Sequence, residues 1–312
     1  MAAESKNGNG AWQLLQPSAL ANLQNLLFAS RVIVEGAFAG RHRSPYKGSA
    51  AEFIDYREYN PGDEIRTIDW KAYARSDRYF VKLFQTETDM NGYLLVDCSA
   101  SMGYGGPAYT RLFGKDTVSK LDYAKHLAAA ISFLLVQQGD RVGLTLFDDR
   151  IRTHRPPGGT FPHLYTLLDA MEKQELGQQT SLSGTLRDAY SLIKRRGLLI
   201  VISDFLDDVD AVIQSLNMYR HRNFEVLLFH VMHPYERQLP PLDAINFVDS
   251  ESGATMTSQS GDIGEAYAAE VNTFIETIRS AAMARGIDYR TVLTDEPYSQ
   301  VLREFLLSRS GR

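Results

Sequence analysis

Runs of apolar residues alternate with helical patterns through the last two thirds of the chain. Tyr93–Val96 and Leu198–Ile202 are apolar at every position, which is typical of strands that are buried on both faces of a parallel sheet. Further apolar runs predict strands at residues 141–147, 151–154, 226–231 and 288–293. Because these strands alternate with helical patterns, the sequence predicts an α/β fold with a doubly wound, mostly parallel sheet of the Rossmann type.

Helices are predicted where apolar residues recur every three or four positions. The predicted helices span about residues 117–138, 164–171, 182–193, 209–219, 267–281 and 298–307. The edge strand at 151–154 is expected to stop before Pro156-Pro157, because proline cannot donate to a strand ladder. Pro240-Pro241 and Ser250–Gly253 indicate an inserted loop and hairpin at about residues 232–262.

The first 88 residues have a different character. Small and polar residues dominate residues 1–16, which predicts a disordered start. Residues 17–88 are predicted to form an N-terminal helix from Pro17 and a small β-rich subdomain, with strands at about 52–59 and 79–88 joined by an irregular connection. Residues 89–312 then form the α/β domain.

Composition narrows the class of protein. The 312 residues are 44% hydrophobic and carry a net charge of -5, which gives no general attraction to nucleic acid. No apolar run approaches the roughly twenty residues that span a bilayer, and residues 1–10 lack the basic-then-apolar pattern of a signal peptide, so none is expected there. A single cysteine excludes an intrachain disulfide, so a reducing, cytoplasmic location is expected. That residue, Cys98, is expected to be a small buried filler.

Oxygen-bearing side chains follow the first buried strand. Asp97, Ser99 and Ser101 stand at alternate positions where that strand ends, and they offer only oxygen to a ligand. Such donors suit a hard cation such as Mg²⁺ or Mn²⁺ better than zinc. His230 and His233 are expected to be structural rather than metal ligands, because their spacing on a strand puts them on opposite faces.

Two later residues are candidates to complete the set. Asp204 ends the other fully apolar strand, and Thr180 stands in the polar loop ahead of the preceding helix. In a doubly wound sheet these strands flank the point where the strand order reverses, so Asp97 and Asp204 are predicted to converge there. Thr180 would join them.

Asp97, Ser99, Ser101, Thr180 and Asp204, in this order and on these elements, resemble the metal-ion-dependent adhesion site of von Willebrand factor A domains. The resemblance implies that the hydroxyls bind a divalent ion directly and that the aspartates act directly or through water. A Glu or Asp of a protein partner would take the last coordination position. Phe205 departs from that family's pattern, in which glycine commonly follows the second aspartate. We expect Met102 and the loop at residues 104–115 to form the rim.

A narrower resemblance covers roughly residues 30–308. It is carried by the following strings: Glu35-Gly36, Gly40–Ser44, Asp55–Asp63, Arg66–Lys71, Val81-Lys82, Ser203-Asp204, Arg220–Arg222 and Gly286–Tyr289. These are similar to a bacterial family known as domain of unknown function fifty-eight. The resemblance implies a von Willebrand A-like domain and a MoxR-type AAA+ ATPase, or its client, as partner in assembly or chaperone-like activity.

The sequence therefore favours a non-enzymatic, metal-dependent protein-binding module. One alternative is an Mg²⁺-dependent phosphohydrolase with Asp97 as nucleophile, but such enzymes generally need an acid two residues later, where this chain has Ser99. The other alternative is a structural α/β domain whose polar strand ends bind no metal.

Overall fold

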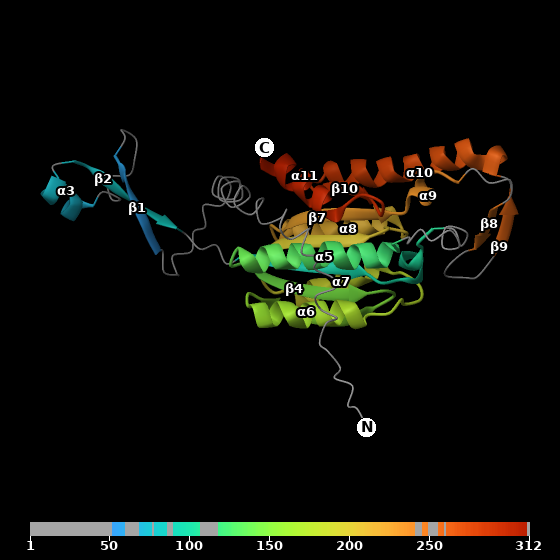
Figure 1. Ribbon diagram of the computed structural model, residues 1–312, viewed down its shortest axis with the longest axis horizontal. Coiled ribbons are helices and arrows are strands. Elements are labelled where there is room, and N and C mark those ends of the chain that lie inside the picture. The colour runs from blue at the N-terminus through green and yellow to red at the C-terminus, as the bar shows by residue number, and fades with distance from the viewer. Residues whose placement is uncertain are drawn as a thin grey trace, which may run out of the picture. The chain divides into compact units, whose positions relative to one another are not determined.

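The computed structural model describes residues 52–59, 69–76, 78–85, 90–106, 118–240, 245–248, 255–258 and 260–310. These residues belong to two units, one within Phe38–Asp89 and the other from Met90 onward (Figure 1). The start predicted at residues 1–16 and the helix predicted from Pro17 lie outside the described residues.

The smaller unit is a two-stranded antiparallel sheet with a short helix between its strands. β1 (Glu52–Glu58) pairs with β2 (Phe80–Gln85), which confirms both predicted strands. The connection was expected to be irregular, and this expectation is wrong at α3 (Trp70–Ser76). Asp69 is the N-cap of this helix, because its side chain accepts a hydrogen bond from the Ala72 backbone N–H at 3.3 Å.

A six-stranded sheet organises the larger unit. Its strands lie in the order β10-β7-β6-β3-β4-β5, and every neighbouring pair is parallel except the antiparallel pair β4-β5. The strands span the following residues: β3 Asn91–Asp97, β4 Arg141–Phe147, β5 Ile151–Gly158, β6 Leu198–Ser203, β7 Glu225–Met232 and β10 Asp288–Leu293. The predicted α/β class with a mostly parallel sheet is confirmed.

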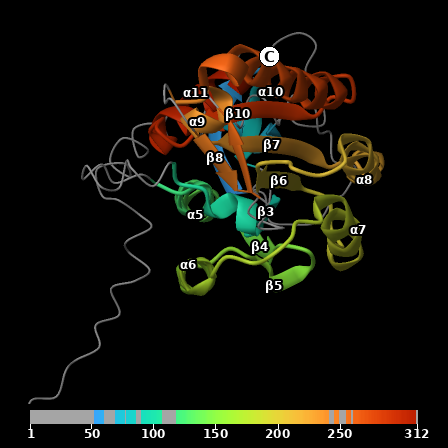
Figure 2. The same cartoon turned by 90° about the vertical axis from the view of Figure 1, so that its right-hand side faces the viewer.

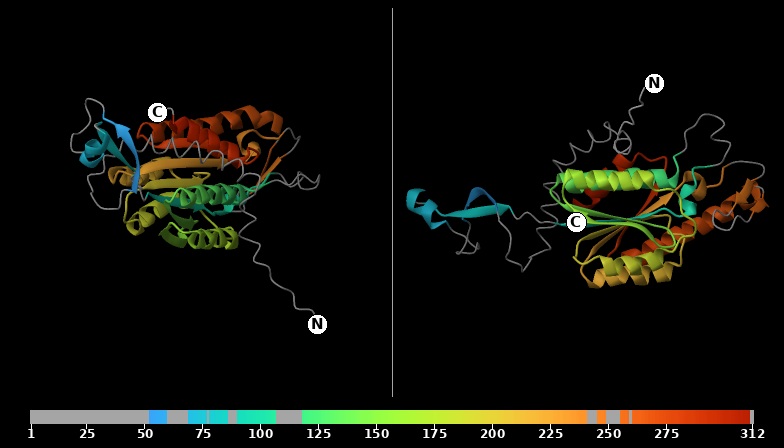
Figure 3. Two further views of the ribbon diagram at one scale, coloured as in Figure 1. Left: turned by 60° about the vertical axis from the view of Figure 1, so that its left-hand side comes forward. Right: turned by 90° about the horizontal axis from the view of Figure 1, so that it is seen from below.

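Helices cover both faces of this sheet (Figures 2 and 3). One layer holds α5 (Lys120–Gln137), α6 (Phe161–Lys173) and α11 (Tyr298–Ser310), and the other holds α7 (Leu182–Leu192), α8 (Val209–His221) and α10 (Ser260–Met283). Successive residues of β3 point to opposite layers, since Leu94 packs in the first core and Leu95 in the second. Burial on both faces explains why the central strands β3 and β6 are apolar over Tyr93–Val96 and Leu198–Ile202.

The edge strand β5 is longer than the sequence predicted. It runs through Pro156 and Pro157 to Gly158, whereas the prolines were expected to end it. Among the described strands β5 pairs only with β4, so its prolines occupy an edge, where a missing N–H donor is tolerated.

The segment after β7 carries short elements that lie outside the main sheet. α9 (Pro234–Arg237) directly follows the strand, and β8 (Ile245–Val248) pairs with β9 (Thr255–Ser258) in an antiparallel ladder. Within the described ranges, no helix combines the length and the apolar character that a bilayer crossing requires.

The order of the strands places the candidate site. β3 lies between β4 and β6, so the chain leaves β3 in one direction along the sheet and later returns on its other side. The carboxyl ends of β3 and β6 are therefore adjacent at the point where the strand order reverses, which is where such sheets bind ligands.

Candidate functional site

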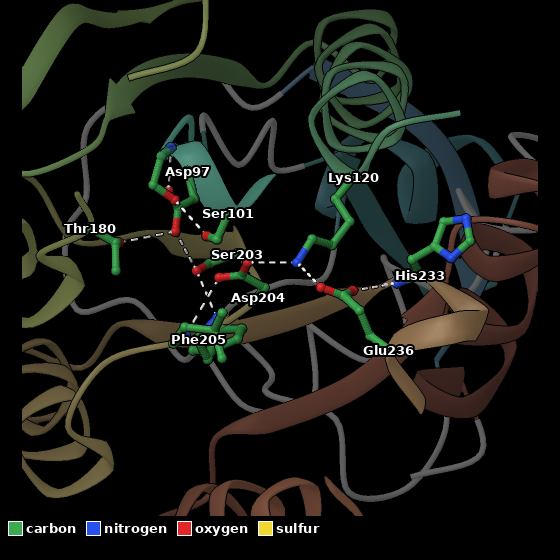
Figure 4. Close-up of polar contacts among 11 residues, drawn as sticks. Asp97, Ser101, Lys120, Thr180, Ser203, Asp204, Phe205, His233 and Glu236 are labelled. Carbon is green, nitrogen blue, oxygen red and sulfur yellow. Dashed lines mark hydrogen bonds and ion pairs between the residues drawn. The ribbon is translucent and has the colours of Figure 1, made fainter. Parts of the chain in front are cut away.

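Asp97 is the last residue of β3 and lies at the centre of a hydrogen-bonded group of side chains. Its side chain is fully buried, and its Oδ1 accepts a 2.9 Å bond from the Ser99 N–H. Its Oδ2 accepts bonds from the hydroxyls of Ser203 at 2.6 Å and Thr180 at 3.4 Å (Figure 4). Asp97 thus joins residues from three separate segments of the chain.

The two serines stand on a turn of 3-10 helix directly after β3. Ser99 precedes this turn, which spans Ala100–Gly103, and Ser101 lies within it. Both residues are buried, and their Oγ atoms are 3.1 Å apart. The Ser101 side chain lies near Asp204 and lowers the pKa of that carboxyl. The turn therefore brings both hydroxyls to the carboxylates of Asp97 and Asp204.

Thr180 reaches the site because its loop is attached to the end of β3. The Gly177 N–H donates to the Cys98 carbonyl at 2.6 Å, and the Ala100 N–H donates to the Gln178 carbonyl at 2.8 Å. These two backbone bonds hold the segment between α6 and α7 against the 3-10 turn. Thr180 follows directly and is half-buried.

Asp204 follows β6, and its position depends on an unusual backbone conformation in the next residue. Phe205 has a φ of 55°, in the left-handed region that residues other than glycine rarely adopt. This conformation explains why glycine would suit the position. The Phe205 N–H donates to Ser203 Oγ at 2.9 Å, while that hydroxyl donates to Asp97. The turn after β6 is thereby linked to the end of β3.

Lys120, which the sequence analysis did not single out, contributes a positive charge to the site. It is the first residue of α5, only 1% exposed, and its Nζ lies 2.8 Å from Asp204 Oδ2 and 2.6 Å from Glu236 Oε1. Its position on the buried face of α5 with Ala124 and Leu127 was the available signal, since lysine is rarely buried without a partner. Glu236 lies on α9, in the segment that was interpreted as an insertion.

Burial and charge move the pKa values of the two aspartates in opposite directions. Burial, together with the nearby charge of Asp204, raises the pKa of Asp97 to about 7, although hydrogen bonds from Ser203 and Ser99 oppose this shift. Burial would also raise the pKa of Asp204, but the Lys120 ammonium holds it below its ordinary value. Asp204 is therefore ionised at neutral pH, whereas Asp97 exchanges its proton in that range.

The structure brings all five predicted residues to one place. Asp97, Ser99, Ser101, Thr180 and Asp204 are linked by the contacts described above. They supply two carboxylates and three hydroxyls, an all-oxygen donor set that fits Mg²⁺ or Mn²⁺. In the described part of the chain, no cluster of three or more His, Cys, Asp or Glu side chains is arranged to hold a metal ion. A metal at this site would thus depend on the hydroxyls.

Several neighbouring predictions have clear outcomes. Met102 was expected at the rim, but it is fully buried in the core beneath α5, so that prediction is wrong. Only residues 104–106 of the expected rim loop are described. Cys98 is a buried core residue, as predicted.

Both histidines after β7 have structural partners. The His230 Nδ1 lies 2.6 Å from the Tyr289 hydroxyl, and the His233 side chain accepts the Tyr235 N–H at the start of α9. Each histidine thus supports the local structure, and that neither binds a metal stays a prediction.

Two mycobacterial relatives are described only as uncharacterised proteins. Rv1480, a protein of Mycobacterium tuberculosis, is 27% identical over 301 residues, which cover 94% of this chain and 90% of the relative. MAV169 of Mycobacterium avium is 28% identical over 170 residues, which cover 53% of this chain and 86% of the relative.

Among solved structures, BatB from Bacteroides thetaiotaomicron is similar at 15% identity and a TM-score of 0.46, covering 72% of this chain and 100% of that one. The SpRpn10 VWA domain is similar at 10% identity and a TM-score of 0.40, covering 68% of this chain and 93% of that one.

The family comparison is more specific. The family model described as "Protein of unknown function DUF58" matches residues 55–273, which include all five candidate site residues. This match spans more than half of the sequence, and it agrees with the resemblance found in the sequence strings. The chain therefore belongs to the DUF58 family.

Proposed function

We propose that this protein is a non-enzymatic module that binds a protein partner through a divalent metal ion. The observation that carries the proposal is the convergence of five oxygen-bearing side chains, from three segments, at the reversal point of a parallel sheet. Ser99, Ser101 and Thr180 would hold Mg²⁺ or Mn²⁺, while Asp97 and Asp204 would balance its charge. The ion would supply an open coordination position for a partner's Glu or Asp.

Exposed apolar side chains on the loops that carry the site support a protein partner. Leu176 is 50% exposed and precedes Thr180 in its loop, and Leu206 is 51% exposed and follows Asp204. Val118 is 42% exposed and precedes Lys120. Apolar side chains around a polar centre are suited to a protein interface, where they exclude water from the central contact. We therefore propose a partner whose acidic residue is flanked by apolar ones.

The proposed partner is a MoxR-type AAA+ ATPase or a client of such an ATPase. This part of the proposal comes from the resemblance of the sequence to its family, and the geometry of the site is compatible with it. A pull-down of the candidate ATPase with and without EDTA tests this step. Retention at full strength under chelation would show that the partner does not use the metal.

Calorimetric titration with Mg²⁺ and Mn²⁺ tests the metal site itself. We expect Thr180→Val to bind the ion about tenfold more weakly, because it loses one direct ligand. Thr185→Val is the matched control, since this hydroxyl is buried on α7 and has no hydrogen-bond partner within the described residues. Equal heats of metal binding from wild type and Asp97→Ala would refute the metal site.

A phosphatase assay tests the alternative function. If the protein hydrolyses a phosphate ester and Asp97→Asn abolishes this activity, the result would support the phosphohydrolase instead.

A further inference from the structure

Lys120 places a positive charge beside a carboxylate of the proposed metal site. Its side chain extends from the start of α5 until Nζ lies between Asp204 and Glu236 (Figure 4). The contact with Asp204 is buried on both sides, with exposed fractions of 1% and 3% for the two side chains. Such a pair is screened little by solvent, so Asp204 already has a strong counter-ion.

A divalent ion at the same carboxylate would meet this ammonium. Two positive charges a few ångströms apart repel each other strongly where water is excluded. The metal ion and the Lys120 ammonium cannot both have Asp204 as their main partner. The donor set suits a metal ion, but the lysine opposes its binding, so one of the two cations must move away from Asp204.

Glu236 provides an alternative position for the ammonium. Its Oε1 lies 2.6 Å from Lys120 Nζ, and its Oε2 accepts the His233 N–H at 2.8 Å at the start of α9. The second bond fixes the carboxylate, and the side chain is 24% exposed, so water can reach it. Lys120 can therefore leave Asp204 without losing its whole charge compensation.

We propose that Lys120 competes with the divalent ion for Asp204 and that Glu236 retains the ammonium when the ion binds. Lys120 thereby sets the metal affinity of the site, and it serves as the counter-ion of Asp204 when no metal is bound. This inference rests on the proposed function, because it assigns a role to Lys120 only toward a metal held by the same five residues.

The test is a Mn²⁺ titration of the full chain, with free Mn²⁺ measured by electron paramagnetic resonance. Lys120→Met keeps most of the length of the buried side chain and removes its charge, so we expect about tenfold tighter binding. Lys125→Met is the matched control, since Lys125 is also buried on α5 but donates to the Gln174 carbonyl. The control should bind as wild type does. Equal or weaker binding by Lys120→Met would overturn the inference.

Glu236→Gln gives an independent result in the opposite direction. Glutamine can still accept the His233 N–H, so α9 keeps its cap, but Lys120 is left with Asp204 alone. We expect Mn²⁺ binding to weaken severalfold, and unchanged or tighter binding would contradict the exchange. This variant decides the matter if Lys120→Met does not fold.

The possible outcomes separate the inference from the proposed function. If wild type binds Mn²⁺ and Lys120→Met binds no better, the metal site stands and the competition is refuted. If only Lys120→Met binds Mn²⁺, the competition is supported and the native site is not a metal site. If neither binds Mn²⁺, both proposals are refuted.

Discussion

At the scale of single residues, two positions other than glycine have a positive φ among the described residues, Phe205 and Asn223. The Phe205 side chain is 2% exposed and packs on His230 with ring centroids 5.5 Å apart. We expect Phe205→Gly to lower the free energy of unfolding by about 2 kcal/mol. Loss of a buried aromatic ring costs about 3–5 kcal/mol, and relief of the left-handed backbone returns about 1–2 kcal/mol.

Asn223→Gly is the control for that variant. Asn223 is exposed and has a φ of 59°, so glycine removes no core packing there. We expect its free energy of unfolding to stay equal or to rise by up to about 1 kcal/mol. Urea unfolding of both variants measures the difference. If Phe205→Gly is as stable as wild type, the relief of the left-handed backbone offsets the whole loss of ring packing at this turn.

His230 predicts a pH dependence of stability. Burial lowers its pKa to about 4, from the ordinary value of 6.5. The unfolded chain therefore binds a proton that the folded chain releases, so His230 contributes stability above pH 6.5 that is lost as the pH falls toward 4. Integrated over this range, the contribution is about 3 kcal/mol.

A comparison with His230→Phe isolates this contribution, because Asp97 titrates over much of the same range with the opposite sign. Phenylalanine keeps the aromatic packing and cannot be protonated. We expect the variant to lose less stability than wild type between pH 6.5 and pH 4 in urea unfolding at each pH. Equal losses in the two proteins would mean that His230 does not titrate there.

The residue types of the site were predictable, whereas the charge balance around them was not. Alternate oxygen donors after an apolar strand identified Asp97 and Ser99, and the matching strand end identified Asp204. Lys120 and Glu236 are 84 and 32 residues from Asp204 in the chain, and only the fold brings both to one carboxylate. Apolar periodicity reports which face of a helix is buried, but it does not report which charges meet there.

At the scale of secondary-structure elements, the loop between α6 and α7 depends on a glycine. A Cβ on Gly177 would lie 2.7 Å from the Cβ of Asp148, which is fully buried and held by Arg152. Since neither group can move cheaply, we expect Gly177→Ala to lower the free energy of unfolding by about 1–3 kcal/mol. It should also weaken Mn²⁺ binding, because the same loop positions Thr180.

Gly264→Ala is the control for the loop variant. Gly264 lies within α10, and a Cβ there would meet no atom within 4 Å. Alanine favours a helix over glycine by about 1 kcal/mol, so stability should rise while Mn²⁺ affinity stays unchanged. Thermal unfolding and Mn²⁺ titration of both variants give the result. Unchanged Mn²⁺ affinity in Gly177→Ala would contradict a role for this loop in metal binding.

Buried strands and amphipathic helices of the larger unit were the most predictable elements. β3 and β6 are apolar because both faces are covered, and this pattern leaves few alternatives to a parallel sheet. Elements that depend on local capping were less predictable. α3 has only seven residues, and its start depends on Asp69. β5 was predicted as an edge strand, but its length was not predicted, because an edge tolerates the missing N–H donors of Pro156 and Pro157 and the strand continues through them.

At the scale of the whole molecule, the larger unit has all the parts that the proposed site needs. The two core clusters consist of residues from Tyr93 to Leu302, and the six strands of the sheet begin at Asn91. The candidate ligands, Lys120 and Glu236 also lie in this range. We therefore expect a shortened chain, Met90–Arg312, to fold cooperatively and to bind Mn²⁺ as tightly as the full chain. Urea unfolding and Mn²⁺ titration of the two chains measure this. A shortened chain that folds but loses Mn²⁺ binding would show that residues before Met90 contribute to the site, and one that does not fold would show that they contribute to the core.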